Sequence, residues 1–116
     1  MPKRPPPSLL KMQREYERCR KDLAAIGYIS QGSVQDRTGR SGAGAGYQWT
    51  RKVAAKTVTV ALTQEQFAAM KDAVSNKRKL TKLISQMEGL SRQILFATHP
   101  HPARRKTLSN KVLGIN

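Results

Sequence analysis

The sequence predicts an α+β fold in which an N-terminal helix, a three-stranded antiparallel sheet and a long C-terminal helix follow one another, the second helix pairing with the first. Near both ends of the chain, apolar residues recur at alternating steps of three and four, the heptad-type spacing of paired helices. Between them, residues 28–62 contain short runs rich in Val, Thr, Tyr and Trp that glycine interrupts, which is typical of strands. A chain of 116 residues suits one such domain, predicted over residues 8–97.

The first predicted helix covers residues 8–26. Residues 1–7 precede it as a basic, proline-rich arm, because prolines remove hydrogen-bond donors and fix φ. Ser8 stands at the N-cap position, and Gly27 follows the helix where a C′ glycine is common. The apolar seam of this helix consists of Leu9, Met12, Tyr16, Cys19, Leu23 and Ile26.

Three strands are predicted near residues 32–37, 47–53 and 56–62. The segment 38–46 joins the first two strands and holds four of the eight glycines, so we expect a flexible loop there. The dipeptide Ala54-Ala55 joins the last two strands and lacks the Asn-Gly or Asp-Gly of two-residue hairpins. We therefore expect this connection to be longer or distorted.

Alternation along the strands predicts a sheet with one polar face. That face presents donors and acceptors that can read base edges or grip phosphates, although an ordinary solvated face is the alternative interpretation. Trp49 lies on the opposite side and is expected to be a core residue more than a base-stacking platform, because the chain has few other large residues. The side chains expected on the polar face are Gln35, Arg37, Gln48, Thr50, Lys52 and Thr57.

The second predicted helix covers residues 63–97. Thr63 and Gln66 form a capping box at its start, and Pro100 stops it. A stripe of Phe67, Met70 and Val74 is suited to covering the sheet. Residues 98–116 are expected to form an extended basic tail. The seam that would pair with the first helix, within one chain or across a homodimer, consists of Ala73, Asn76, Leu80, Leu83, Met87, Leu90 and Ile94.

The net charge of +15 comes from 22 basic and 7 acidic residues and is spread over every predicted element. Cations distributed over folded elements and tails favour nucleic acid as the partner. A membrane is not expected as a partner, because the seams are narrow and no apolar run is long enough for a membrane span or a signal peptide. The candidate nucleic-acid-binding residues are Lys3, Arg4, Lys11, Arg14, Arg18, Gln35, Arg37, Arg40, Gln48, Lys52, Lys56, Lys77, Arg78, Lys79, Arg104, Arg105 and Lys106.

No residue pattern indicates catalysis, a metal or a cofactor, so we expect a non-enzymatic protein. Cys19 lies within an apolar seam, where a small core residue is expected, and a single cysteine permits no internal disulfide and favours the cytosol. His99 and His101 have no cysteine or carboxylate nearby to complete a metal site.

The glycine-rich segment 38–46 precedes a strand rather than a helix, unlike a nucleotide-binding loop. Two readings of it stay open. Its glycines would let the backbone beside Arg37 and Arg40 approach a phosphate chain closely, or the segment is a plain hairpin tip.

Three runs, GSVQDR at 32–37, YQWTRKV at 47–53 and KTVTVALT at 56–63, followed by a long basic helix, resemble a family of small prokaryotic proteins. That family is a domain of unknown function often found near transposable elements, and the resemblance covers about residues 27–95. Many members carry an Arg-Cys-Gly-Lys loop between the first two strands. This sequence has TGRSGAGAG there, so no role of that loop is carried over. The order of three strands then a helix is also similar to the arm-binding domains of tyrosine recombinases, which lay a three-stranded sheet in the DNA major groove.

The function expected from these features is that of a nucleic-acid-binding accessory protein in a mobile-element or ribonucleoprotein complex. Distributed lysines and arginines would grip the phosphate backbone. DNA and RNA both stay open as ligands, with the two basic extensions favouring a structured RNA. The alternative is a coiled-coil oligomerisation or adaptor protein whose charge meets an acidic protein partner.

Overall fold

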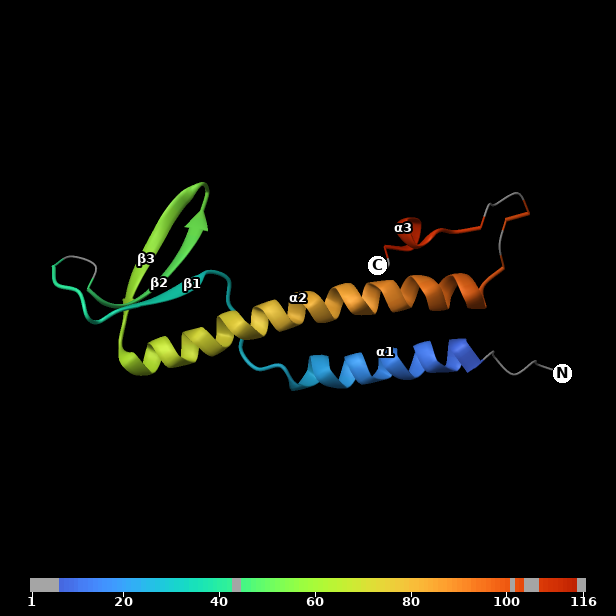
Figure 1. Cartoon of the computed structure of the whole chain (residues 1–116), viewed down its shortest axis with the longest axis horizontal. Helices are drawn as coiled ribbons and strands as arrows, with labels where there is room; N and C mark the ends of the chain where they lie inside the picture. Colours follow the sequence, from blue (N-terminus) through green and yellow to red (C-terminus); the bar gives the residue numbers. More distant parts are fainter. Residues whose placement is uncertain (1–6, 43–44, 101, 104–106, 115–116) are drawn as a thin grey trace. The chain divides into compact units, whose positions relative to one another are not determined.

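A computed structural model describes residues 7–42, 45–100, 102–103 and 107–114 of the chain. The sheet has three antiparallel strands, and in the sequence these strands come after one long helix and before another. This order confirms the predicted α+β class. Most of the predicted basic arm, residues 1–6, lies outside the described residues. The elements in order are α1 (Pro7–Ala25), β1 (Ser33–Arg37), β2 (Gly46–Val53), β3 (Lys56–Leu62), α2 (Gln64–Thr98) and α3 (Asn110–Leu113) (Figure 1).

The chain divides into two compact units, where the sequence predicted one domain over residues 8–97. One unit is Ile26–Leu80, and the other combines Met1–Ala25 with Thr81–Asn116, so that α2 contributes to both. The physical reason is the small number of buried apolar side chains, which fall into separate groups. Ala73 and Val74 are buried in the first unit, and Leu9, Cys19 and Leu90 are buried in the second.

In the unit Ile26–Leu80, the apolar side of the sheet faces the start of α2. Trp49 in the central strand lies opposite Val34 of β1 and Val60 of β3. On the same side of β2, the ring of Tyr47 packs against the ring of Phe67 with centroids 4.7 Å apart. The predicted apolar stripe of α2 therefore meets the sheet at this ring pair.

The turn between β2 and β3 contains only Ala54 and Ala55, so the expected longer or distorted connection was wrong. Val53 pairs directly with Lys56 across the turn. The φ angles of Ala54 and Ala55 are 50° and 66°. Positive φ at both central residues is characteristic of the type I′ turn, whose twist matches that of the flanking strands. Alanine adopts this conformation at a cost in energy, because its Cβ crowds the backbone.

The linker between α1 and β1 is held to the sheet unit through its backbone. Asn76 Nδ2 donates to the carbonyl oxygen of Tyr28 at 2.9 Å, and the indole Nε1 of Trp49 donates to the carbonyl oxygen of Gln31 at 2.9 Å. Gly32 closes the linker at φ +105°, where a Cβ would come within 2.6 Å of the indole nitrogen. Asn76, expected in the seam between the helices, therefore serves to anchor the linker.

In the second unit, α1 runs antiparallel to residues 81–98 of α2 (Figure 1). The most buried apolar positions of this unit belong to the predicted seams, which confirms the pairing of the two helices for this part of the chain. Leu23 is an exception, with 37% of its surface exposed. The buried members are Leu9, Cys19 and Leu90, and the half-buried ones are Met12, Tyr16, Leu83, Met87 and Ile94.

The C-terminal tail is not extended throughout, which corrects the prediction. α3 is a single helical turn, with the Ser109 side chain accepting a backbone N–H at its start and Gly114 at φ 74° at its end. Arg92 of α2 donates from Nη1 to the carbonyl oxygen of Leu113 at 3.0 Å, and its Nη2 pairs with Glu88 at 3.1 Å. One arginine thus fastens the turn to α2, an arrangement that the local sequence of the tail does not reveal.

Candidate nucleic-acid interface

On one face of the sheet, every side chain larger than that of alanine is polar, and we call this face the polar face. The antiparallel register places Gln35 opposite Gln48, and Lys52 opposite Thr57. Because side chains alternate along each strand, these residues lie on the side away from the Tyr47–Phe67 ring pair. The polar face consists of Ser33, Gln35, Arg37, Gln48, Thr50, Lys52, Thr57 and Thr59.

Hydrogen bonds within the polar face orient its side chains. Arg37 Nε donates to Gln35 Oε1 at 3.2 Å, and the hydroxyls of Ser33 and Thr50 lie 3.1 Å apart. The Arg37–Gln35 bond uses one guanidinium N–H, and the four N–H groups on the terminal nitrogens take no part in it. Most members of the face are exposed, whereas Arg37, Gln48 and Thr50 are half-buried. The face therefore offers partly ordered amide, guanidinium and hydroxyl groups to a ligand.

The polar face contains no carboxylate. Asp36 is the one acidic residue in the sequence between positions 27 and 62, and it pairs with Tyr47 on the opposite side of the sheet. Its Oδ1 accepts the hydroxyl of Thr38 at 2.6 Å and the backbone N–H of Thr38 at 3.0 Å. These hydrogen bonds, the hydroxyl first, lower the pKa of Asp36 below its ordinary value. The Asp36 carboxylate thus organises the turn after β1, and it lies on the opposite side of the sheet from Arg37 and Lys52.

The remaining sheet candidates, Arg40 and Lys56, lie off the polar face. Arg40 is exposed and lies in the turn after β1, where its backbone N–H donates to the carbonyl oxygen of Arg37 at 3.1 Å. Lys56 is exposed at the start of β3, and its register opposite Val53 puts it on the other side of the sheet from Lys52. The loop between β1 and β2 includes residues 43–44, which lie outside the described residues.

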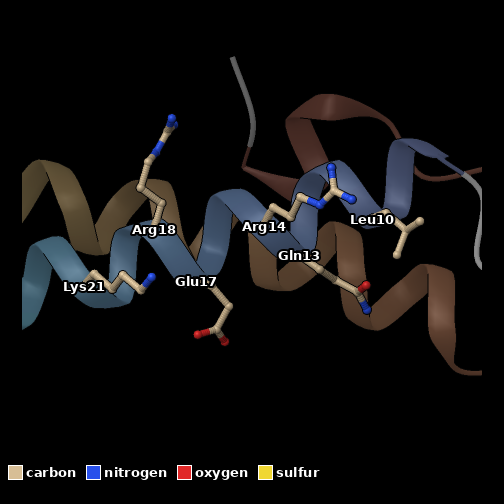
Figure 2. Close-up of a pocket in the computed structure, with 6 residues that line it drawn as sticks. All are labelled: Leu10, Gln13, Arg14, Glu17, Arg18 and Lys21. Carbon is tan, nitrogen blue, oxygen red and sulfur yellow. The ribbon is translucent and has the colours of Figure 1, made fainter.

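A second candidate surface is the outer side of α1 (Figure 2). Leu10, Arg14, Glu17 and Arg18 help to line a shallow open hollow on this helix, and the predicted Lys11 is exposed on the same helix. Glu17 forms an exposed ion pair with Arg20 at 3.0 Å. This surface carries more positive than negative side chains, so it can attract phosphates. Unlike the polar face, it includes a carboxylate, that of Glu17, among its polar groups.

The cations predicted on α2 do not form one stripe. Lys77, Arg78 and Lys79 are consecutive in the helix, where successive side chains are about 100° apart around the axis. Arg78 and Lys79 are exposed, whereas Lys77 is half-buried. Of the predicted binding residues in the arm and tail, Lys3, Arg4, Arg104, Arg105 and Lys106 lie outside the described residues.

The described residues offer no metal-binding group of three or more His, Cys, Asp or Glu side chains. Cys19 is 2% exposed, so its thiol belongs to the interior of the helix pair, as predicted. His99 follows the last residue of α2, and its Nδ1 lies 3.0 Å from the carbonyl oxygen of Leu95. His101 lies outside the described residues. In the part of the chain that the structure describes, no helix has both the length and the apolar surface needed to cross a bilayer.

Two members of the polar face, Ser33 and Thr59, were missing from the predicted binding surface. Both lie inside predicted strands, so the alternation that placed Gln35 and Thr57 on the polar face also places Ser33 and Thr59 there. Trp49 is half-buried, and the guanidinium carbon of Arg51 lies 5.7 Å from the centre of its ring. The Trp49 ring contacts the backbone of Gln31 and the side chain of Arg51, so it has a packing role within the protein rather than a role in binding a ligand.

No protein-family model matches the chain, and comparison with curated proteins and with solved structures also gives no match. The resemblance to a family found near transposable elements therefore rests on its sequence runs and stays a prediction.

Proposed function

We propose that the protein is a non-enzymatic nucleic-acid-binding accessory protein that acts within a mobile-element or ribonucleoprotein complex. Lysines and arginines spread over its elements hold the phosphate backbone, and the sheet provides the central contact surface. The observation that carries the proposal is the polar face, which combines Arg37 and Lys52 with amide and hydroxyl groups and has no carboxylate. Groups of this kind bind phosphates and base edges in nucleic-acid complexes.

The charge of the whole chain supports the same conclusion. Basic residues exceed acidic ones by 15, and exposed cations occur on α1, on the sheet and on α2. If about 6–10 of these cations neutralise phosphates, affinity falls by about 10³–10⁵ between about 50 and 200 mM salt, because released counterions drive the binding.

The test is a fluorescence-anisotropy titration with duplex and single-stranded DNA and RNA over this range of salt. Lys52→Gln should lower the slope of log affinity against log salt by about 0.9 on duplex DNA, the contribution of one phosphate contact. Lys56→Gln is the matched control, since it removes the same charge from the same hairpin on the opposite side of the sheet. Absence of salt-dependent binding to all four nucleic acids would refute the proposed function.

A second candidate function, self-association or adaptor activity through the helices, has its own supporting observation. An open hollow in the two-helix unit is lined in part by the apolar side chains of Tyr16, Leu23, Ile84 and Met87. Leu23 and Ile84 are 37% and 43% exposed, which leaves apolar surface for another helix. Sedimentation at low salt separates the two functions: a stable oligomer that stays free of added nucleic acid favours the adaptor.

A further inference from the structure

We infer that β3 is an interface for a second copy of this chain, whose own β3 pairs with it as an antiparallel strand and joins the two sheets into one. This interface differs from the helical seams through which a homodimer was predicted, and it does not depend on nucleic-acid binding. It follows from the exposure of β3 at one edge of the sheet, from the direction of its backbone groups and from a side-chain pattern that is complementary to itself.

The edge formed by β3 lacks the features that keep sheet edges from pairing with other chains. β3 is an outer strand of the sheet, and each of its residues from 56 to 61 is exposed. Natural proteins protect edge strands by short length, charges, prolines or bulges. Within the described residues, 57–62 include no charge and no proline, and their register with β2 has no bulge. β1, the other outer strand, has five residues against seven and carries Asp36 and Arg37, so β3 is the unprotected edge.

The backbone of β3 directs donors and acceptors out of the sheet at alternate residues. A Cβ on Gly32 would lie 2.4 Å from the carbonyl oxygen of Thr50, so that oxygen points to the β1 side of β2. Thr50 lies opposite Thr59. In an antiparallel pair, opposite residues either exchange both hydrogen bonds or direct both backbone groups away from each other. The N–H and C=O of Thr59 therefore point away from β2, and by alternation so do those of Thr57 and Ala61.

A second β3 fits this edge in a register centred on Thr59. A twofold axis at Thr59 pairs all seven residues of the strand, because positions 56 and 62 lie equally far from the axis. Thr59 then lies opposite Thr59 of the second copy, and Thr57 lies opposite Ala61 of the second copy. Each such pair has both backbone groups directed at its partner and exchanges both bonds, which gives about six hydrogen bonds across the interface.

The side chains are complementary in this register. Val58 and Val60 lie on the apolar side of the sheet, where Val60 is opposite Trp49 of β2. Across the new interface, Val58 lies opposite Val60 of the second copy, and the reverse pair follows by symmetry. These valines are 39% and 41% exposed in the single chain, so the pairing covers apolar surface of both copies. On the polar side, the threonine side chains at position 59 meet at the axis, and Thr–Thr pairs of this kind stabilise adjacent strands.

The positive charge of the chain opposes this pairing only weakly. Lys56 is the one charged residue of β3, all of which the structure describes, and it lies opposite Leu62 of the second copy. The two Lys56 positions are therefore six residues apart along the strands, or about 20 Å at about 3.4 Å per residue. The Debye length is about 8 Å at physiological ionic strength, so charges at this separation are largely screened.

Pairing through β3 stops at two copies. Both β3 strands become inner strands of the joined sheet, and its outer strands are the β1 strands of the two copies. Asp36 and Arg37 on β1 disfavour the addition of a third copy. The chain thus supplies a strand of the same length and complementary pattern, in a symmetry that closes, which favours a second copy over a strand of a different protein.

The experiment is sedimentation equilibrium of the full chain, freed of nucleic acid, over a range of protein concentrations. It uses about 1 M salt, where the Debye length is about 3 Å and nucleic acid is released from cationic proteins. The chain should form dimers under these conditions. Hydrogen exchange followed by NMR should show protection of the Thr57, Thr59 and Ala61 amides that rises with protein concentration, because these N–H groups point out of the single sheet.

Substitutions at Thr59 test the register. Thr59→Lys and Thr59→Glu each place like charges opposite each other at the axis, whereas a mixture of the two proteins places opposite charges there. The mixed dimer should be about 2- to 30-fold tighter than either like-charged dimer. Thr59→Pro removes a donor that points away from β2, so the bonds to β2 remain and one interface bond is lost from each copy. The dissociation constant should therefore rise by about 5- to 150-fold.

Two further variants serve as controls. Ser75→Lys adds the same charge as Thr59→Lys at an exposed position of α2 in the same unit and should leave dimerisation unchanged. Ile84→Lys places a charge in the hollow of the two-helix unit and tests the competing association through the helices. Circular dichroism of each variant confirms that the sheet is folded.

A chain that stays monomeric at every concentration overturns the inference and leaves the β3 edge to a strand of a different protein. A dimer that folded Thr59→Pro does not weaken, or a mixture of the two charged variants that dimerises no better than either alone, also overturns it. A dimer that only Ile84→Lys weakens overturns it in favour of association through the helices. Nucleic-acid binding by a monomer leaves the proposed function standing, whereas a β3 dimer that binds no nucleic acid refutes that function alone.

Discussion

The turn between β2 and β3 gives the most direct test of the structure. Ala54 and Ala55 have φ angles of 50° and 66°, in the left-handed region that glycine and asparagine adopt more readily than alanine. The double substitution A54N/A55G installs the Asn-Gly pair that a two-residue type I′ turn favours. Both changes lie at the turn, outside the polar face, so the candidate binding surface keeps its side chains.

The expected effect follows from two opposing contributions. A left-handed conformation costs an alanine about 1–2 kcal/mol, and Asn-Gly removes much of that cost at both positions. Glycine in turn loses more conformational entropy on folding than alanine, by about 0.5–1 kcal/mol. The free energy of unfolding should therefore rise by about 1–2 kcal/mol. For a chain of this size that corresponds to an increase in melting temperature of about 4–8 °C.

Thermal unfolding followed by circular dichroism measures the change, and hydrogen exchange at the Val53 and Lys56 amides localises it to the hairpin. Ala61→Gly is the control, because Ala61 lies in the interior of β3 and has no positive φ. The same type of substitution should there destabilise the protein by about 0.5–1 kcal/mol. If A54N/A55G leaves stability unchanged or lowers it, the two-residue turn with positive φ at both positions is incorrect.

Three further predictions concern other parts of the chain. Gly32→Ala should destabilise the sheet unit by at least about 2 kcal/mol in urea unfolding, because its Cβ would lie 2.4 Å from a backbone oxygen at φ +105°. The pKa of Asp36 is lowered in the fold, so its stabilisation is complete above the unfolded value near 3.8 and is lost as pH falls through the folded pKa. Asp36→Asn should therefore make the decline in melting temperature between about pH 5 and pH 2 shallower, and an unchanged decline would contradict the role of its bond to Thr38. Arg92→Ala should speed hydrogen exchange in α3 by about 5- to 100-fold, with Arg92→Lys intermediate, whereas unchanged exchange would show that the bond to Leu113 does not hold the turn.

Much of the fold could be predicted because local patterns reflect covalent geometry. The two-residue period of strands assigned Gln48 and Lys52 to one face and Trp49 to the other before any pairing was known. The capping box at Thr63 and Gln66 marked the start of α2, and both of its hydrogen bonds are present at 3.0 and 3.1 Å. The bounds of the two long helices and the three strands differ from the predicted ones by at most one residue, because ends depend on single hydrogen bonds.

The candidate site was predictable in composition but not in arrangement. Alternation put Gln35 and Gln48 on the same face of the predicted sheet, but only the register makes them direct neighbours. The bond from Arg37 to Gln35 requires a particular pair of rotamers, which no sequence pattern specifies. Charge alone does not distinguish Lys56 from Lys52, and it is the register that puts these two lysines on opposite sides of the sheet.

The sequence by itself determined the order of the elements, the polar and apolar sides of the sheet and the excess of positive charge, since these depend on residue identity and on the fixed periods of strand and helix. Only the tertiary structure decided the features that need contacts between distant residues. These are the strand register, the anchoring of the linker by Asn76, the turn fastened by Arg92 and the division of α2 between two units. Each depends on a hydrogen bond or a packing contact whose partner is many residues away, and local sequence does not encode which partner is chosen.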